Sequence, residues 1–191
     1  MVTSVRLYLA LLALVALERG VELVLSARNA RLARTRGGVE AGRAHYPVMA
    51  VFHGAFLVAC ALEVVLLQRP FPGTVGWVAL GVVLAAQALR YWAIATLGWR
   101  WNTRIVVVPG SAPVTGGPYR FVRHPNYVAV IAEMLALPLV HGAWLTALVF
   151  SAGNAWLLRV RIRAEEDALG EPWRDAFAGR PRFVPGGPGG H

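Results

Sequence analysis

The residues best suited to chemistry stand in a short polar block between two apolar stretches, at positions 116–127. The block reads GGPYRFVRHPNY, so two arginines, one histidine and two tyrosines fall within nine residues. Gly-Gly-Pro predicts a turn with exposed backbone N–H groups. An apolar helix is expected to begin at the end of the block, with the positive end of its dipole pointing at the cluster. This arrangement suits a ligand with a carboxylate and an aromatic ring, and a basic loop that contacts lipid phosphates would have the same composition.

A second charged block follows the next apolar stretch and reads RVRIRAEEDAL at positions 159–169. On a helix, Glu165 lies four residues after Arg161, and Glu166 lies three residues after Arg163, so each carboxylate has a guanidinium neighbour. The two glutamates are about 100° apart around the helix axis, so we expect one pair to face a site and the other to face solvent. An ordinary solvated helix with weak ion pairs would show the same pattern.

The elements that must position these blocks are membrane helices. Hydrophobic residues make up 57% of the 191 residues and charged residues only 15%, whereas a soluble domain carries about 25% charged residues. Three runs are long enough to cross a bilayer, at 5–25, 48–67 and 75–97. Two shorter runs, 127–139 and 143–158, predict a tight helical hairpin. We therefore expect an all-α polytopic membrane protein with three transmembrane helices plus a helical hairpin, about five membrane segments, and a cytoplasmic C-terminal helix.

The arginines predict the orientation of these helices. All 19 basic residues are arginine, the net charge is +9, and the arginine-rich segments are 26–46, 98–126 and the tail after Leu158. The connection 68–74 holds only Arg69. The positive-inside rule places the rich segments in the cytoplasm. We expect a multi-pass protein of the inner (plasma) membrane with its N-terminus outside and its C-terminus in the cytoplasm, and we attribute the basic charge to lipid headgroups rather than to nucleic acid.

The chain is expected to form one membrane domain over residues 1–180. Residues 1–97 supply the N-terminal spans and the substrate side, and residues 98–180 supply the polar loop, the hairpin and the C-terminal helix. Residues 181–191 are rich in proline and glycine and predict a flexible tail.

Several other chemistries lack their sequence signatures. Cys60 is the only cysteine, which excludes an intrachain disulfide. His45 and His53 are eight positions apart and no H-E-x-x-H pattern occurs, so no metal site is expected. The G-x-S-x-G signature of serine hydrolases is absent as well. Most tryptophans, Trp99 and Trp101 among them, lie near the ends of the apolar runs, where anchoring at the membrane interface accounts for them.

Together, the two polar blocks resemble the isoprenylcysteine carboxyl methyltransferase family of integral-membrane methyltransferases. The resemblance covers the C-terminal half and rests on Gly117-Pro118-Tyr119, on Arg123-His124-Pro125 with Tyr127, and on Glu165-Glu166 with Leu169. It implies S-adenosylmethionine as the methyl donor, bound on the cytoplasmic side with Glu165 or Glu166 nearby. The residues that it implies for the donor site are Gly117, Pro118, Tyr119, Arg123, His124, Pro125 and Tyr127.

The N-terminal half resembles a bacterial branch of that family whose members O-methylate alkylpyrones or alkylresorcinols. This resemblance rests on Glu18-Arg19 with Glu22, Ser26 with Arg28-Asn29, Gly37-Gly38 with Glu40, and His45-Tyr46-Pro47 with His53. The polar end of the acceptor site is then expected to comprise Glu22, Arg28, Asn29, His45 and His53.

Charged side chains inside the apolar runs need polar partners, because an unpaired charge is costly in hydrocarbon. Local ion pairing of Glu18, Arg19 and Glu22 is the alternative to a role for Glu22 in the acceptor site. Arg90 lies deeper in its run, and we expect Glu133 to be its partner.

The sequence therefore predicts S-adenosylmethionine-dependent methyl transfer to an oxygen of a lipophilic, membrane-embedded acceptor, best matched by a long-chain polyketide phenol or pyrone. For a phenol, Glu165 or Glu166 would accept the proton. For a carboxylate, Arg161 or Arg163 would hold the anion. Carboxyl methylation of an isoprenylcysteine-like substrate, phospholipid N-methylation, and a non-enzymatic transporter or scaffold are the alternatives. The expected partners are the lipophilic substrate and the bilayer, without nucleic acid or metal.

Overall fold

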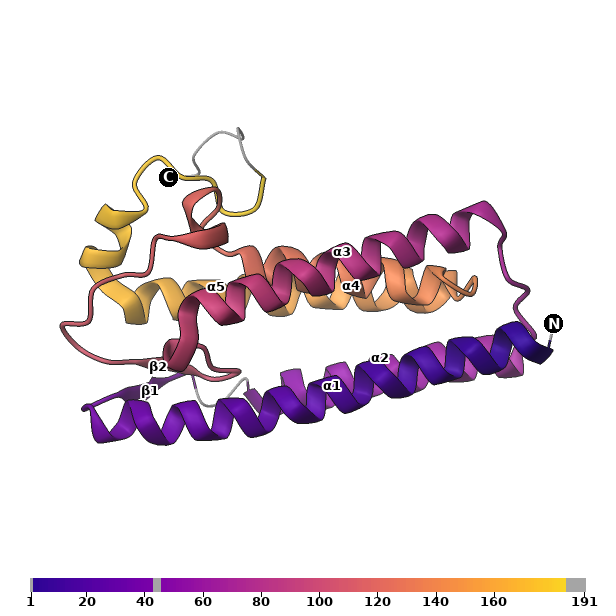
Figure 1. Cartoon of the computed structure of the whole chain (residues 1–191), viewed down its shortest axis with the longest axis horizontal. Coiled ribbons are helices and arrows are strands. Elements are labelled where there is room, and N and C mark those ends of the chain that lie inside the picture. The colour runs from indigo at the N-terminus through magenta and orange to yellow at the C-terminus, as the bar shows by residue number, and fades with distance from the viewer. Residues whose placement is uncertain (1, 43–45, 185–191) are drawn as a thin grey trace.

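The computed structural model describes residues 2–42 and 46–184, and its long helices lie roughly along one axis (Figure 1). The long helices are α1 (Val2–Thr35), α2 (Tyr46–Leu66), α3 (Thr74–Leu97), α4 (Pro125–Leu139) and α5 (Trp144–Ala176). Two short 3₁₀ helices, η2 (Gly98–Arg100) and η3 (Gly117–Arg120), lie in the connection between α3 and α4. The prediction of a mostly helical chain is confirmed.

One feature departs from an all-α fold. Strand β1 (Val39–Ala41) pairs with strand β2 (Ile105–Val107) in an antiparallel ribbon, with Val39 opposite Val107. The ribbon ties the α1–α2 connection to the α3–α4 connection at one end of the bundle (Figure 1). Arg104 reinforces it, because its guanidinium donates to the Glu40 carboxylate at 2.9 Å.

The surface of the helices is rich in apolar side chains. Within the described residues, two helices are long and apolar enough to cross a membrane, Tyr46–Leu66 and Thr74–Arg100. The exposed large side chains of α1 include Leu7, Leu14, Leu17, Val21 and Val24, and those of α5 include Leu148, Val149 and Trp156. Exposed apolar side chains in this number are typical of a protein whose surface meets lipid or another apolar partner.

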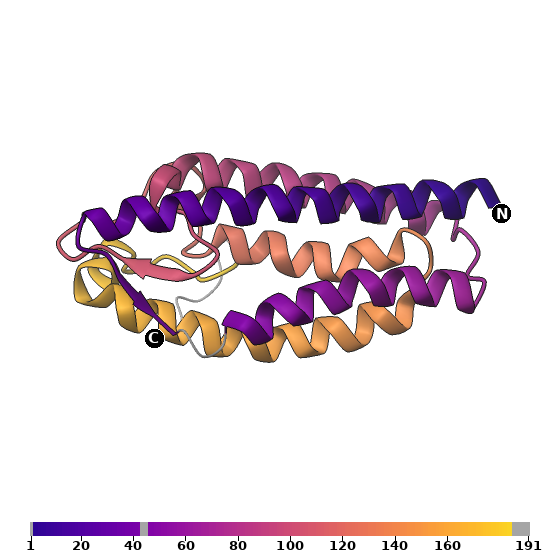
Figure 2. The ribbon, with the colours of Figure 1, turned by 90° about the horizontal axis from the view of Figure 1, so that it is seen from below.

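The short helix α4 is covered by its neighbours. It begins at Pro125, a residue that suits the first helical position because it has no N–H to satisfy. In Figure 2 it lies in the middle of the bundle, and eight of its 15 residues are buried. A 15-residue helix is about 22 Å long, shorter than the hydrocarbon core. This burial explains how so short an apolar helix is accommodated.

Helix α5 continues from the apolar run into the charged block without a break until Gly170. Gly170 adopts φ +69°, outside the helical region, and Pro172 follows. The chain therefore turns at Gly170, as glycine with a positive φ allows. The turn brings Trp173 and Phe177 back toward η3, where both are buried.

The start of α5 is capped by a side chain from another helix. The Glu63 carboxylate of α2 accepts hydrogen bonds from the backbone N–H groups of Leu145 and Thr146, at 3.2 and 2.7 Å, and from the Thr146 hydroxyl at 2.7 Å. Arg69 donates to the same carboxylate at 3.1 Å. These contacts satisfy amide groups that have no partner inside the helix.

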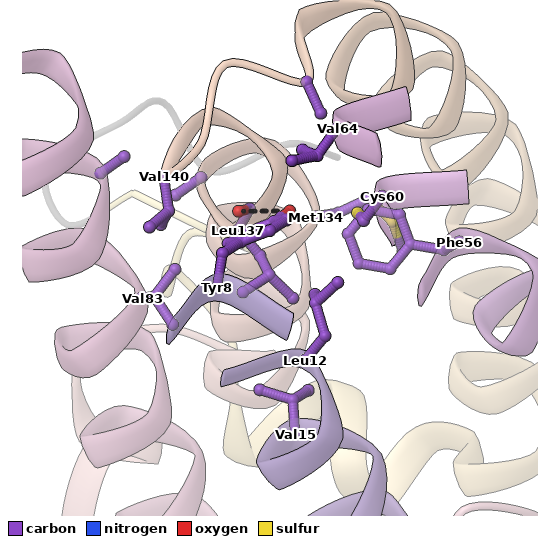
Figure 3. Packing of buried hydrophobic residues seen from close by; sticks show 13 residues of the cluster. Tyr8, Leu12, Val15, Phe56, Cys60, Val64, Val83, Met134, Leu137 and Val140 are labelled. Carbon is purple, nitrogen blue, oxygen red and sulfur yellow. Dashed lines mark hydrogen bonds between the residues drawn. The ribbon is translucent and has the colours of Figure 1, made fainter. Parts of the chain in front are cut away.

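The apolar core lies at the end of the bundle opposite the β ribbon. Tyr8, Leu12 and Val15 of α1 pack there against Phe56, Cys60 and Val64 of α2 and against α3 and α4 (Figure 3). The Tyr8 hydroxyl donates to the backbone oxygen of Leu137 at 3.2 Å, so its one polar atom is paired.

Five charged residues of the apolar runs, Glu18, Arg19, Glu22, Arg90 and Glu133, form one network between α1, α3 and α4. The predicted pair is confirmed, with Arg90 Nη2 2.6 Å from Glu133 Oε2. Arg19 lies 2.6 Å from Glu22 and 3.6 Å from Glu133, and Arg90 lies 3.8 Å from Glu22. The pairing is therefore both local and between helices.

Candidate active site

A cavity of about 440 Å³ lies at the end of the bundle that carries the β ribbon. Its walls are most of the segment 99–114, the junction 119–127 between η3 and α4, and the part of the chain from Arg161 to Phe177. A volume of this size is typical of small-molecule sites. The two polar blocks, about 40 residues apart in the sequence, thus form one site.

The turn that starts the first block depends on Gly117. This residue has φ +54°, and a Cβ built on it would lie 2.3 Å from the Thr96 hydroxyl oxygen. Only glycine fits such a position, both for its backbone conformation and for its close approach to α3. The turn places the buried side chain of Tyr119 on the cavity wall. Burial and the nearby Glu165 carboxylate raise the pKa of the Tyr119 phenol, which therefore stays neutral.

His124 occupies the residue before the first turn of α4 and is 5% exposed. Its ring lies between the rings of Tyr127 and Trp173, with centroid distances of 5.3 and 5.5 Å. Its Nε2 is 3.0 Å from Glu166 Oε1. His124 lines the cavity, so a buried imidazole held by a carboxylate faces the site.

Arg161 joins three walls of the cavity through directional contacts. Its Nε donates to the Tyr127 hydroxyl at 2.7 Å, and its Nη2 donates to the backbone oxygen of Thr103 at 2.7 Å. The Tyr127 hydroxyl in turn donates to Glu165 Oε2. The Arg161 guanidinium, the Tyr127 phenol and the Glu165 carboxylate therefore form a chain of hydrogen bonds along the wall. Arg161 is only 5% exposed.

The two glutamates of the second block have different surroundings. Glu165 lines the cavity, whereas Glu166 is not among the described lining residues. Burial alone would raise the pKa of Glu166, but hydrogen bonds from His124 and Arg182 outweigh it and lower the pKa to about 2. The expected division into one pair that faces the site and one pair that faces solvent does not hold: Glu166, the glutamate outside the lining, is buried and binds Arg182, while Arg163 is exposed. The long Arg182 side chain reaches it because the chain turns back after α5.

The segment 99–114 is the part of the wall that the sequence motifs did not indicate. Trp101 is 4% exposed and lines the cavity, so interface anchoring does not describe it. Asn29 holds it in place by donating to its backbone oxygen at 2.8 Å, and Ser26 accepts a hydrogen bond from Thr103 N at 3.0 Å. The grouping of Ser26 with Asn29 in the sequence was the available signal, and it marks support for this loop.

The stretch of the chain that contains both polar blocks matches a known protein family. The model of the isoprenylcysteine carboxyl methyltransferase (ICMT) family matches residues 77–171. The protein YpbQ of Bacillus subtilis, described as uncharacterized, is 41% identical over 162 residues, which cover 84% of this chain and 95% of the relative. The chain belongs to the ICMT family. An uncharacterized protein of Haemophilus influenzae is 28% identical over 152 residues, covering 79% of this chain and 88% of the relative.

Membership of the ICMT family identifies the chain as one of a family of membrane methyltransferases. The matched range contains η3, α4 and most of α5, and so contains Tyr119, His124, Tyr127, Arg161 and Glu165 on the cavity wall. Gly117, Pro118 and Pro125 shape the η3–α4 junction from positions outside the described lining, and Arg123 lies on the lining itself.

The residues expected at the acceptor end do not share one location in this ICMT-family protein. Glu22 belongs to the charged network, and His53 lies in a smaller pocket with Arg19, Arg90 and Glu133. Arg28 is exposed on α1, and Asn29 supports the loop at Trp101. His45 lies outside the described residues. Among the residues described, none of the other four lines the large cavity.

Proposed function

We propose that this protein is an integral-membrane methyltransferase that uses S-adenosylmethionine to methylate an oxygen of a lipophilic acceptor. The observation that carries the proposal is the single cavity in which the family's two motifs meet, with His124 and Glu165 on its wall. A long-chain polyketide phenol or pyrone is the acceptor that we propose.

The cavity fits the chemical groups of the donor. S-Adenosylmethionine, when bound, supplies a methyl carbon activated by a sulfonium, together with an adenine, an ammonium group and a carboxylate. Trp173 and Tyr119 offer aromatic faces for the adenine, and the Arg123 guanidinium is a partner for the carboxylate. The Glu165 carboxylate supplies negative charge for the cationic part. Much of the rest of the wall is apolar, which limits water near the reacting atoms.

Glu165 is the side chain that we assign to the acceptor's proton. A neutral phenol is a weak nucleophile, so a carboxylate that takes its proton during transfer raises the rate. Glu165 lines the cavity, whereas Glu166 is occupied by His124 and Arg182. Arg161, fixed by Tyr127 and Thr103, would hold the anionic oxygen of a carboxylate acceptor on the same wall.

Replacing His124 with alanine is expected to weaken binding of S-adenosylhomocysteine by about tenfold. The substitution removes from the cavity wall a buried imidazole that can form a hydrogen bond with the ligand. Isothermal titration of the detergent-solubilised protein measures this. Arg163→Ala serves as the control, since Arg163 is exposed and outside the lining. Equal affinity of the His124→Ala variant and the wild type would remove His124 from the donor site.

We also propose that the cavity opens to the cytoplasm and that the 68–74 connection faces outward, with five membrane segments and an outside N-terminus. In a Cys60→Ser background, an impermeant maleimide added to intact cells is expected to label a Thr74→Cys variant. The reagent is expected to label an Asp167→Cys variant only after the membrane is permeabilised. Both positions are exposed on the protein surface, so labelling depends only on which side of the membrane each cysteine lies. Labelling of Asp167→Cys in intact cells would contradict this topology.

A further inference from the structure

The chain after α5 returns to the site and crosses the junction between η3 and α4. We call residues 180–183 the C-terminal strap. Four hydrogen bonds attach it: Arg123 N to Pro181 O at 2.9 Å, His124 N to Arg182 O at 3.2 Å, Arg123 Nε to Arg180 O at 2.6 Å, and Arg180 Nη1 to Tyr119 O at 3.0 Å. The strap includes the first residues of the expected flexible tail, and it is fixed to the residues of the first polar block.

Arg182 extends this attachment to the second polar block. Its Nε and Nη2 donate to the two oxygens of Glu166, at 3.1 and 2.7 Å. Paired contacts of this kind fix the plane of a carboxylate as well as its position. Phe183, the next residue, packs against Tyr127, Leu158 and Ile162, which anchors the strap beyond Arg182.

The fixed carboxylate determines which nitrogen of His124 carries a hydrogen. The pKa of Glu166 is about 2, so the side chain is ionised at neutral pH and can only accept hydrogen bonds. Its neighbour His124 Nε2, 3.0 Å away, must therefore be the donor. In the neutral ring Nδ1 then has no hydrogen and is the nitrogen left to accept one. A ligand group that binds Nδ1 of the neutral ring would therefore be an N–H or O–H donor, such as an amino group.

We propose that Arg182 is a positioning residue of the donor site, acting through Glu166 to hold His124 with its hydrogen on Nε2. This inference rests on the proposed function. Arg182 lies beyond the range that the family model matches, which ends at residue 171. The site of this chain is therefore completed by a segment outside the family motifs, and the strap is part of the donor site rather than a loose tail.

The test compares two arginines of similar exposure. The Arg182 side chain is 42% exposed and Arg174 is 47% exposed, but Arg174 pairs with Glu171 and Asp167 on the outer surface. Arg182→Gln is expected to raise the dissociation constant of S-adenosylhomocysteine about tenfold, whereas Arg174→Gln leaves it unchanged. Arg182→Lys should fall between the wild type and Arg182→Gln, because an ammonium keeps the charge but loses the paired geometry. Thermal unfolding of each variant confirms that it is folded.

Two further measurements separate positioning from a general structural role. In a double-mutant cycle, Arg182→Gln should add little to the loss caused by Glu166→Gln, because both act through the same contact. Nitrogen NMR of histidine-labelled protein should show His124 with its hydrogen on Nε2 in the wild type and in Arg174→Gln. The Arg182→Gln variant should show a mixture of the two tautomers.

If the wild type binds S-adenosylhomocysteine and Arg182→Gln shows the same affinity and the same His124 tautomer, this inference is overturned and the proposed function stands. Wild-type protein that binds no S-adenosylhomocysteine would overturn the proposed function and the donor-site role of Arg182 with it.

Discussion

The Glu165→Gln variant is expected to transfer methyl groups to an alkylresorcinol about 100-fold more slowly than the wild type, or slower still, because the phenol loses its proton acceptor. Glutamine keeps the size and polarity of the side chain but cannot take a proton. Glu165 lines the cavity and accepts a hydrogen bond from the Tyr127 hydroxyl. Glutamine can accept the same hydrogen bond through its amide oxygen, so the side chain should keep its position. Initial rates at saturating donor measure the effect.

The acceptor itself supplies the sharpest control for this experiment. A prenylcysteine analogue presents a carboxylate that is already ionised at neutral pH, so Glu165→Gln should change its methylation rate far less. The matched variant Glu166→Gln alters the neighbouring position on the same helix. It should affect donor affinity more than the phenol-specific rate, since Glu166 contacts His124 and Arg182. A Glu165→Gln variant that methylates the phenol at the wild-type rate would disprove the proton-acceptor role.

The parts of the fold that follow a period or a motif were predictable. Apolar runs indicated the helices, and the isolated charge of Arg90 indicated its partner Glu133. The meeting of the two polar blocks followed from the hairpin between them, which returns the chain to the same end of the bundle. The adjacent positions of Glu165 and Glu166 on one helix indicated that only one of the two could face the cavity, and left open which one.

Contacts between distant, aperiodic segments were not predictable. The wall at Trp101 depends on a hydrogen bond that Asn29 donates to Trp101 and on one that Ser26 accepts from Thr103 N, across more than 70 residues of sequence. A tryptophan near the end of an apolar run has the same sequence context whether it meets lipid headgroups or a cavity. The strap at Arg182 lies in a segment rich in proline and glycine, so its composition indicated disorder although its individual groups have fixed partners.

Several of the residues expected at the acceptor end have protein partners in this structure, and that too has a physical reason. Polar side chains near a membrane helix end can serve a ligand or satisfy other protein groups, and sequence shows only that they are polar. Asn29 satisfies backbone oxygens of the loop, and Glu22 neutralises Arg19 and Arg90. These contacts connect the N-terminal helix to the loop at Trp101 and to α3.

Arg161 is the side chain whose loss should affect both acceptors. Replacing it with glutamine removes the donors to the Tyr127 hydroxyl, in buried surroundings, and to the backbone oxygen of Thr103, in partly buried surroundings. Hydrogen bonds from charged groups contribute about 1.5–3 kcal/mol each, so the loss of two should slow methyl transfer by at least about 100-fold. The effect should be at least as large for a carboxylate as for a phenol, because the wall is displaced for both and the carboxylate also loses the guanidinium that would hold its anion.

Arg163, two positions later on the same helix, gives the control for this prediction. Its side chain is exposed, so Arg163→Gln should leave both rates and the thermal stability close to those of the wild type. The Arg161→Lys variant separates the effect of charge from that of geometry. If it methylates only the carboxylate acceptor at a high rate, Arg161 acts on the acceptor anion. If it is slow with both acceptors, the fixed contacts with Tyr127 and Thr103 are what methyl transfer requires. Wild-type rates in Arg161→Gln would show that methyl transfer does not need this wall, and the site would then have to lie elsewhere in the bundle.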